Sequence, residues 1–349
     1  GRISIFDLGV KALPNSNFVV LSPNWDNGSI VNVGAVTWGS GTTGVTGPVS
    51  ISNSLIGKRT DDAVGNGGIT VLTNNNYLIR SSDWDNTGAP NAGAVTWAGG
   101  TSGISGELSS GNSLVGTIAN DRMGLTESVQ GVFPLTNGNY VVVCSKCDFG
   151  AAVDGGAVVW GNGTTGISGP VSTAISIHGA FKDRIGSDGV TALTNGNYVV
   201  KSSSWPNDLN MGAATWGNGT TGTTGTVSSS NSLVGSTDFD GIGRNVTALS
   251  NGNYVVYSFL WDNGAAADVG AVTFCNGATG TSGTISSSNS LIGSVSNDAV
   301  GLNGVVALTN GNYVIASSLW DNVALTDAGA VTWVDGSVGL TGTITSSNS

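Results

Sequence analysis

One order of apolar and polar positions repeats six times along the chain. The phrase Leu-Thr-Asn-Gly-Asn-Tyr-Val-Val recurs with small changes at intervals of 56 to 63 residues. Its copies begin at Leu13, Leu72, Leu135, Leu193, Leu249 and Leu308. A fixed period of this kind is typical of propellers and solenoids. One copy is too small to bury both faces of a sheet, so we expect neighbouring copies to stack on one another.

Each copy has the pattern of four short strands. In the fifth copy, β-prone runs at 245–249, 253–258 and 270–274 and a Ser-rich segment at 284–292 are separated by turns. The turn between the first two runs is Ser-Asn-Gly. Asn-Gly between β-prone runs is a strong hairpin signal, because both central residues of a type I′ turn need positive φ. The sequence therefore predicts an all-β fold built from four-stranded antiparallel sheets.

Closing six such sheets into a ring gives a six-bladed β-propeller, which we predict as a single domain over residues 1–349. The copies are expected to span approximately 1–57, 58–116, 117–179, 180–235, 236–293 and 294–349. The last copy stops inside its fourth strand at 346–349, and residues 1–7 have the pattern to supply the missing strand. We thus expect N- and C-terminal strands to close the ring. The alternative is an open array cut from a larger exported protein.

Composition excludes several classes of partner. The chain has 56 glycines among 349 residues and only 9% charged residues, which leaves no long stretch suited to a soluble helix. Its net charge is −11 and Lys and Arg form no cluster, so nucleic acids and anionic membrane surfaces are not expected partners. No apolar run approaches the length of about 18 residues that membrane insertion needs.

The order of motifs resembles the FG-GAP repeat of integrin-α-type propellers. Asp121-Arg-Met-Gly124 and Asp183-Arg-Ile-Gly186 are similar to that family's opening "DRFG", and Gly156-Ala-Val-Val-Trp160 is similar to its "GxVYVF" strand. The wording of the copies also resembles uncharacterised repeats of bacterial filamentous-haemagglutinin-like exoproteins. These resemblances imply a propeller on a bacterial surface or in the extracellular space, with a role in adhesion.

Two features depart from the FG-GAP pattern. That family commonly has an acidic calcium loop between its first two strands, where this chain has Leu-Thr-Asn-Gly-Asn-Tyr. Neutral amides supply too few of the carboxylate oxygens that calcium prefers, so we expect no metal and no cofactor. Integrin-type propellers also usually have seven blades, whereas six copies are present here.

The motif Trp-Asp-Asn is the main candidate for ligand binding. It stands where a strand gives way to a variable loop, and a Trp face beside Asp and Asn has the chemistry for sugar recognition. The candidate residues are Trp25, Asp26, Asn27, Trp84, Asp85, Asn86, Trp205, Trp261, Asp262, Asn263, Trp320, Asp321 and Asn322. The fourth copy has Trp205-Pro-Asn-Asp208, with the polar residues in a shifted order. The competing interpretation is a packed Trp followed by an Asx turn.

Two other repeated positions favour structural roles. A second set of aromatic residues ends the Gly-Ala-Val-Thr strand and predicts packing between neighbouring copies. Its members are Trp38, Trp97, Trp160, Trp216, Phe274 and Trp333. A single Asp also recurs three residues before a glycine, in the motif Asp-x-(Val/Ile/Met)-Gly. Its copies are Asp62, Asp121, Asp183, Asp240 and Asp298. A regularly repeated acid is expected to accept hydrogen bonds from a turn rather than to catalyse a reaction.

The third copy departs from the repeat, with Cys144-Ser-Lys-Cys147 in place of Ser-Ser-x-Trp. Cys275 and His178 are the only other residues of this chemistry, and they occupy different strand positions, so a zinc site is not expected. We predict a disulfide between Cys144 and Cys147 in an oxidising compartment, which leaves Cys275 unpaired. Near-identical copies leave no unique catalytic site, and the chain is predicted not to be an enzyme.

These observations predict a non-enzymatic extracellular module for binding or adhesion. Its expected partners are glycans, held by the Trp-Asp-Asn loops, or cell-surface proteins. The alternative is a structural subunit of a surface layer or extracellular filament, which self-associates and has no small-molecule ligand.

Overall fold

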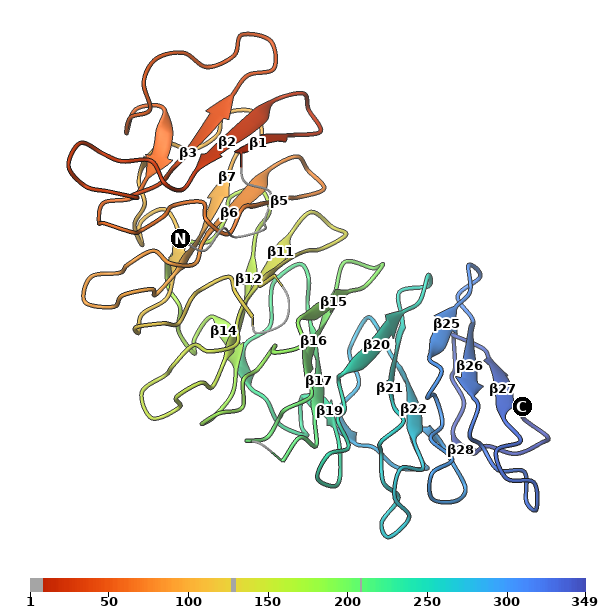
Figure 1. Ribbon diagram of the computed structural model, residues 1–349. Coiled ribbons are helices and arrows are strands. Elements are labelled where there is room, and N and C mark those ends of the chain that lie inside the picture. The colour runs from red at the N-terminus through yellow and green to blue at the C-terminus, as the bar shows by residue number, and fades with distance from the viewer. Residues whose placement is uncertain (1–8, 127–129, 208) are drawn as a thin grey trace. The chain divides into compact units, whose positions relative to one another are not determined.

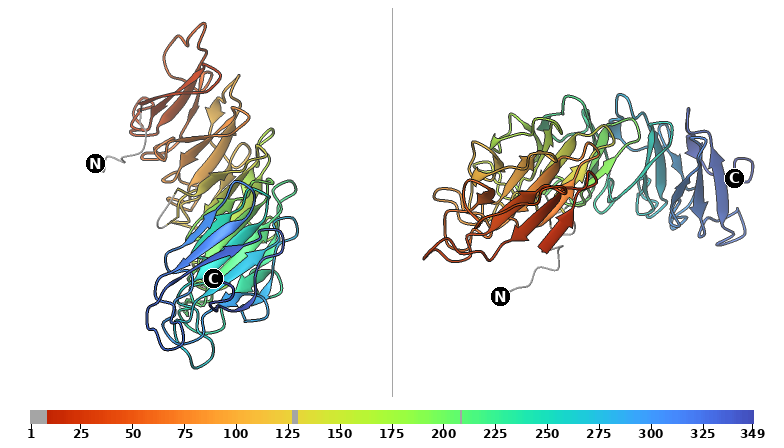
Figure 2. Two further views of the ribbon diagram at one scale, coloured as in Figure 1. Left: turned by 90° about the vertical axis from the view of Figure 1, so that its right-hand side faces the viewer. Right: turned by 90° about the horizontal axis from the view of Figure 1, so that it is seen from above.

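The computed structural model describes residues 9–126, 130–207 and 209–349. These residues form short strands joined by turns, and no helix among them is long and apolar enough to cross a membrane. The chain divides into two compact units, residues 1–176 and 177–349. Within each unit the sheets of successive repeats lie side by side (Figures 1 and 2). The prediction of one domain over the whole chain stays a prediction.

The first unit contains the first three repeats. The first repeat forms β1 (Gly9–Ala12), β2 (Phe18–Ser22), β3 (Ala35–Gly39) and β4 (Ser54–Ile56). The second forms β5 (Ile69–Val71), β6 (Tyr77–Ser81), β7 (Ala94–Ala98), β8 (Gly106–Glu107) and β9 (Leu114–Val115). The third forms β10 (Val132–Pro134), β11 (Tyr140–Cys144), β12 (Ala157–Gly161) and β13 (Gly169–Pro170), and β14 (Ser176–His178) follows at the boundary.

The second unit repeats this order. Its fourth repeat forms β15 (Val190–Ala192), β16 (Tyr198–Ser202), β17 (Ala213–Gly217), β18 (Gly225–Thr226) and β19 (Ser232–Val234). The fifth forms β20 (Asn245–Ala248), β21 (Tyr254–Ser258), β22 (Ala271–Cys275), β23 (Gly283–Thr284) and β24 (Leu291–Ile292). The sixth forms β25 (Val305–Ala307), β26 (Tyr313–Ser317), β27 (Ala330–Val334) and β28 (Gly342–Thr343).

The complete sheets have five strands, which corrects the predicted four. In the order β1-β2-β3-β4-β8, the first four strands are antiparallel and come from one repeat. The fifth strand, β8, comes from the next repeat and pairs in parallel with β4, Leu55 opposite Gly106 and Ile56 opposite Glu107. The same donation joins β13 to β9, β23 to β19 and β28 to β24. A two-residue Gly-x strand has no apolar alternation, so the sequence pattern did not reveal it.

Closure of a ring is not observed in the described part of the chain. The strand expected from residues 1–7 lies outside the described residues. The last sheet contains β25, β26 and β27, without a fourth or fifth strand. The closed six-bladed ring therefore stays a prediction, while the six repeated β-sheets are confirmed.

The Tyr of the repeated phrase is fully buried in the second to sixth repeats, and the first repeat has Phe18 at this position. Tyr77, Tyr140, Tyr198, Tyr254 and Tyr313 are among the largest fully buried side chains. The ring of Tyr140 lies against the glycine that ends the paired strand, and a Cβ at Gly161 would lie 2.2 Å from Tyr140 Cζ. A glycine follows the Trp of this strand in three of the six repeats, at Gly39, Gly161 and Gly217.

Candidate functional site

We call the Trp-Asp-Asn motif, or its equivalent in each copy, the corner. Five copies have a Trp at the corner, and in three of them its side chain points into the protein. Trp84, Trp261 and Trp320 are only 2–6% exposed and belong to the hydrophobic cores of their repeats. Their rings therefore contact protein and are not open for stacking on a sugar, while ligand binding at these corners stays a prediction. Trp25 and Trp205 are half-buried, so a sugar-binding role at those two positions stays a prediction.

The Asp of the corner holds the loop that follows it. Asp85 Oδ1 accepts a hydrogen bond from Asn91 N at 2.7 Å, across six residues. Asp26, Asp262 and Asp321 make the same bond at 2.7 Å to Asn32, Asp268 and Asp327. The Asn then closes the loop tip, because Asn86 and Ala89 exchange two backbone hydrogen bonds of 3.0 and 2.9 Å. Asn27, Asn263 and Asn322 are bridged in the same way to Ile30, Ala266 and Leu325. The corner is a loop scaffold, as the packing interpretation expects.

The recurring buried Asp connects this corner to the turn before the next strand. Asp62 Oδ2 accepts from Lys58 N and Arg59 N, both at 2.7 Å, and Asp62 Oδ1 accepts from Asp85 N at 3.1 Å. Burial raises the pKa of Asp62, against the opposing effect of these three backbone donors. Asp183, Asp240 and Asp298 make equivalent bonds. The structural role expected for these acids is confirmed.

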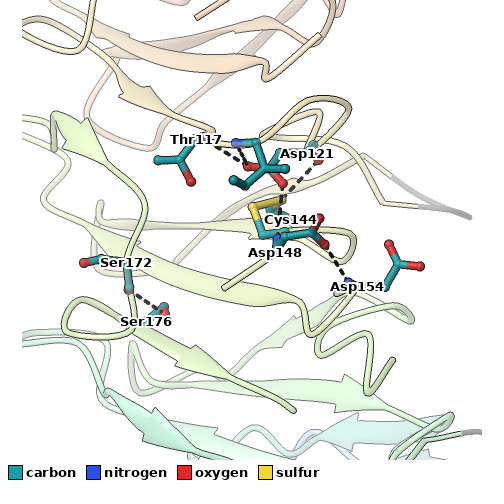
Figure 3. Close-up of a disulfide and its surroundings, with 9 residues drawn as sticks. Thr117, Asp121, Cys144, Asp148, Asp154, Ser172 and Ser176 are labelled. Carbon is teal, nitrogen blue, oxygen red and sulfur yellow. Dashed lines mark hydrogen bonds between the residues drawn. A yellow bond between two sulfur atoms is a disulfide. The ribbon is translucent and has the colours of Figure 1, made fainter. Parts of the chain in front are cut away.

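The third repeat keeps this corner although it lacks the Trp (Figure 3). Cys144 and Cys147 form a disulfide with an S–S distance of 2.09 Å, and both residues are buried in the core of the repeat. Asp121 still accepts from Thr117 N at 2.8 Å and from Asp148 N at 3.2 Å (Figure 3). Cys144 Sγ lies 3.2 Å from Asp121 O, a sulfur–oxygen contact without a proton, because the sulfur is oxidised.

No catalytic arrangement is found around this exception in the described residues. A cavity of about 300 Å³ lies beside the disulfide, with Asp121, Arg122, Ser145 and Lys146 in its wall. The buried Ser145 hydroxyl has no hydrogen-bond partner, so no base is bonded to it. Elsewhere, Cys275 is free and buried, and burial raises the pKa of its thiol to about 12, which suppresses the thiolate. No group of three or more His, Cys, Asp or Glu among the described residues is placed to hold a metal.

The structure also reveals a contact between repeats that the sequence pattern left undefined. Asn15 Nδ2, Asn17 Nδ2 and Trp38 Nε1 of the first repeat donate to the carbonyl oxygen of Gly100 in the second, at 2.8, 2.9 and 3.2 Å. Asn74, Asn76 and Trp97 donate in the same way to Gly163 O. In the second unit, Asn195, Asn197 and Trp216 donate to Gly277 O.

The Trp ring in this contact also packs on a second glycine of the next repeat. A Cβ built at Gly103 would lie 2.3 Å from Trp38 Cβ, and one at Gly166 would lie 2.7 Å from Trp97 Cβ. The corresponding distance from Gly280 to Trp216 Cβ is 2.7 Å. Packing between copies, predicted for the second aromatic set, is confirmed at these three positions. The two asparagines of each Asn-x-Asn turn thus hold the neighbouring repeat.

Comparison with known proteins identifies the repeat and no activity. A family model described as a repeat of unknown function (DUF5650) matches six times, at residues 12–66, 71–125, 134–187, 192–244, 248–302 and 307–349. No curated protein matches the chain. Among solved structures, a streptogramin B lyase aligns over 93% of this chain and 78% of its own, at 9% identity and a TM-score of 0.34, too low to support an argument. The resemblances to FG-GAP and haemagglutinin-like repeats stay predictions. Because the six matches cover most of its length, the chain belongs to the DUF5650 family of repeats.

Proposed function

We propose that this chain is a non-enzymatic extracellular binding module that contacts its partners through the loops after the Trp-Asp-Asn corners. The observation that carries this proposal is the contrast within each corner. The Trp and Asp are used to hold the loop, whereas the loop tips differ between copies and expose apolar side chains. The exposed residues of these tips are Ile30, Val31, Val153, Leu209, Val323 and Leu325. Variable loops on a repeated rigid scaffold are typical of binding surfaces.

The chemistry of the tips favours a protein partner. Val323 is 100% exposed and Leu325 is 64% exposed, in a loop held by Asp321 Oδ1 and by the Asn322–Leu325 bridge. Exposed apolar side chains on an ordered loop gain free energy when a partner surface covers them. A glycan version of this function would use the first repeat, where the half-buried Trp25 lies beside exposed Asp26 and Asn27.

Two features support the extracellular and non-enzymatic parts of the proposal. A disulfide such as Cys144–Cys147 persists mainly in oxidising compartments. Within the described residues, the acids and thiols singled out by the sequence accept hydrogen bonds in turns, form the disulfide or lie in the core.

Binding to intact cells tests the proposal. The labelled chain should bind cells whose surface proteins are present and lose most of this binding after the cells are treated with protease. A double variant, Val323→Ser with Leu325→Ser, should reduce binding, whereas Ile51→Ser, which removes an exposed side chain outside the corners, should not. Equal binding by both variants would contradict the loop assignment. Loss of binding after glycan removal, together with loss in Trp25→Ala, would instead support the glycan version.

A further inference from the structure

Eleven asparagines of the chain are followed directly by glycine, and two of them differ from the rest in their surroundings. An Asn-Gly pair is prone to deamidation, because glycine has no side chain to hinder the approach of its nitrogen to the Asn side chain. The eleven are Asn27, Asn66, Asn137, Asn162, Asn195, Asn218, Asn251, Asn263, Asn276, Asn303 and Asn310. All lie in the described residues, so the hydrogen bonds of each pair can be compared.

The glycine nitrogen, which is the attacking atom in deamidation, is hydrogen-bonded in nine of these pairs. Gly67 N donates to Arg80 O at 3.0 Å, and Gly219 N donates to Asn197 Oδ1 at 2.9 Å. A hydrogen bond of this kind fixes the peptide plane and stabilises the protonated nitrogen, so it opposes attack on the Asn side chain. The nine donors are Gly67, Gly138, Gly163, Gly196, Gly219, Gly252, Gly277, Gly304 and Gly311.

The side-chain amides of the same nine asparagines are hydrogen-bonded as well. Asn66 Nδ2 donates to Asp83 Oδ2 at 2.7 Å, and Asn195 Nδ2 donates to Gly277 O at 2.8 Å. Each of the other seven accepts a backbone N–H at its Oδ1. The carbon to be attacked is therefore held in place too, and these nine pairs can react only after local opening of the structure.

Asn27 and Asn263 have neither restraint. Both are exposed at the tips of corner loops, and neither side chain makes a hydrogen bond to any described residue. Gly28 N and Gly264 N likewise have no acceptor in the described part of the chain. The two glycines have φ near +65° and +63°, in the turn that the backbone bridge of each corner closes. The nitrogen and the side chain that must meet are thus both free to move.

We propose that Asn27 and Asn263 are sites of spontaneous deamidation in the folded protein. The glycine nitrogen attacks Asn Cγ, so that an N–Cγ bond forms and the Cγ–Nδ2 bond breaks. The proton of the glycine nitrogen leaves with the Nδ2 group as ammonia, and a succinimide remains. Water then opens the succinimide at either carbonyl and gives aspartate or isoaspartate. The chemistry needs only water besides the chain itself.

The reaction changes a corner loop in two ways. Either product adds one negative charge beside Asp26 or Asp262, whose Oδ1 atoms hold the rest of the loop. Isoaspartate also inserts a methylene into the backbone between the two residues that exchange hydrogen bonds at the loop tip. The modification requires no binding partner, so it goes beyond the proposed binding function and is tested independently of it.

The sixth corner provides a matched control within the chain. Asn322 is followed by Val323, which has φ near +54°, and the backbone bridge from Asn322 to Leu325 closes the same kind of turn. Within the described residues, the Asn322 side chain and Val323 N also lack hydrogen-bond partners. The branched Val side chain is the main difference, and it hinders closure of the succinimide ring. Gly264→Val should therefore protect Asn263, and Val323→Gly should make Asn322 reactive.

Peptide mass spectrometry of the 349-residue chain tests the proposal. The folded chain is incubated in mildly alkaline buffer and then digested with pepsin at acidic pH, where deamidation is slow. Asn27 and Asn263 should each convert into two products that chromatography separates. Their rates should be at least about tenfold above those of the other nine sites, because local opening limits those. In guanidinium chloride all eleven sites should react at similar rates, while Asn322 should stay slow.

Three results would overturn the proposal. The first is reaction at Asn66 or Asn195 as fast as at Asn263 in the folded chain, because hydrogen bonding would then give no protection. The second is absence of reaction at Asn27 or Asn263 in the folded chain, although both react in guanidinium chloride. The third is an unchanged rate at Asn263 in Gly264→Val, in which Asn27 serves as the internal standard. Circular dichroism of each variant checks that it is folded.

Discussion

The tight contact between a Trp of one repeat and a glycine of the next makes a quantitative prediction. Gly166 has φ near +75°, and a Cβ there would lie 2.7 Å from Trp97 Cβ and 2.9 Å from Trp97 Cγ. Gly44 occupies the same repeat position with φ near +71°, and its Cβ would meet nothing within 4 Å. Gly166→Ala and Gly44→Ala therefore share the backbone cost and differ in the steric cost.

The magnitudes follow from these geometries. Alanine at left-handed φ costs roughly 1–2 kcal/mol at either position. At Gly166 the indole must also retreat by several tenths of an ångström, and overpacking of this kind costs about 1–3 kcal/mol. Gly44→Ala should thus lower the free energy of unfolding by about 1–2 kcal/mol, and Gly166→Ala by about 2–5 kcal/mol.

Urea unfolding followed by tryptophan fluorescence measures the difference. Both variants are compared at one protein concentration. The slope of each transition is compared with that of the unchanged chain, so that a loss of cooperativity is not mistaken for a loss of stability. Equal midpoints for the two variants would refute the steric argument, because only the backbone cost would then remain.

Other consequences concern hydrogen bonds, pH and the disulfide. Trp97→Phe keeps a smaller aromatic ring and removes one of three donors, so the lost hydrogen bond should cost about 0.5–1.5 kcal/mol by urea unfolding, and a cost as large as that of Trp97→Ala would contradict this. Burial raises the folded-state pKa of Asp62 and Asp121 above the unfolded value, so their protonation favours folding. Their contribution is therefore largest below the unfolded pKa and is lost as pH rises through the folded pKa. Urea midpoints measured from pH 3.5 upward should show this decline, and the double variant Asp62→Asn with Asp121→Asn should flatten it. Reduction of Cys144–Cys147, which closes a very short loop, should cost about 2 kcal/mol, measured as a lower urea midpoint in dithiothreitol, with Cys144→Ser as the control that dithiothreitol does not affect.

The hairpins, the buried Asp and the disulfide could be predicted from the sequence, because the residues of a single repeat determine each of them. The Asn-Gly turns and β-prone runs predicted the hairpins, since turn residues and alternation act over a few positions. The buried role of Asp62 followed from its recurrence beside varying neighbours. The disulfide followed from two cysteines replacing Ser and Trp in one corner.

Contacts between repeats could be predicted from the sequence only in part. The fifth strand of each sheet is a Gly-x pair such as Gly106–Glu107, whose position depends on the β4 edge of the previous repeat and not on its own side chains. The direction of the corner tryptophans was also ambiguous, because Trp beside Asp and Asn suits both a sugar site and a packed loop. Burial of Trp84 in the core decides between these two at its corner, and the half-buried Trp25 shows that the same motif has different surroundings in different copies.

The neutral Asn-x-Asn turn explains why the repeats have a direction. Asn17 Oδ1 accepts from Gly41 N in its own repeat, and Asn17 Nδ2 donates to Gly100 O in the next. Asn76 makes the same pair of hydrogen bonds one repeat later. Its Oδ1 accepts from Gly100 N, and its Nδ2 donates to Gly163 O.

An amide side chain does both, whereas a carboxylate at Asn17 or Asn76 would accept from its own repeat and have no proton to donate to the next. A calcium-binding acid and this hydrogen-bonded ladder are therefore incompatible at one position. Every described link runs from donor to acceptor in the same sense along the chain, and this common sense gives the ladder its direction.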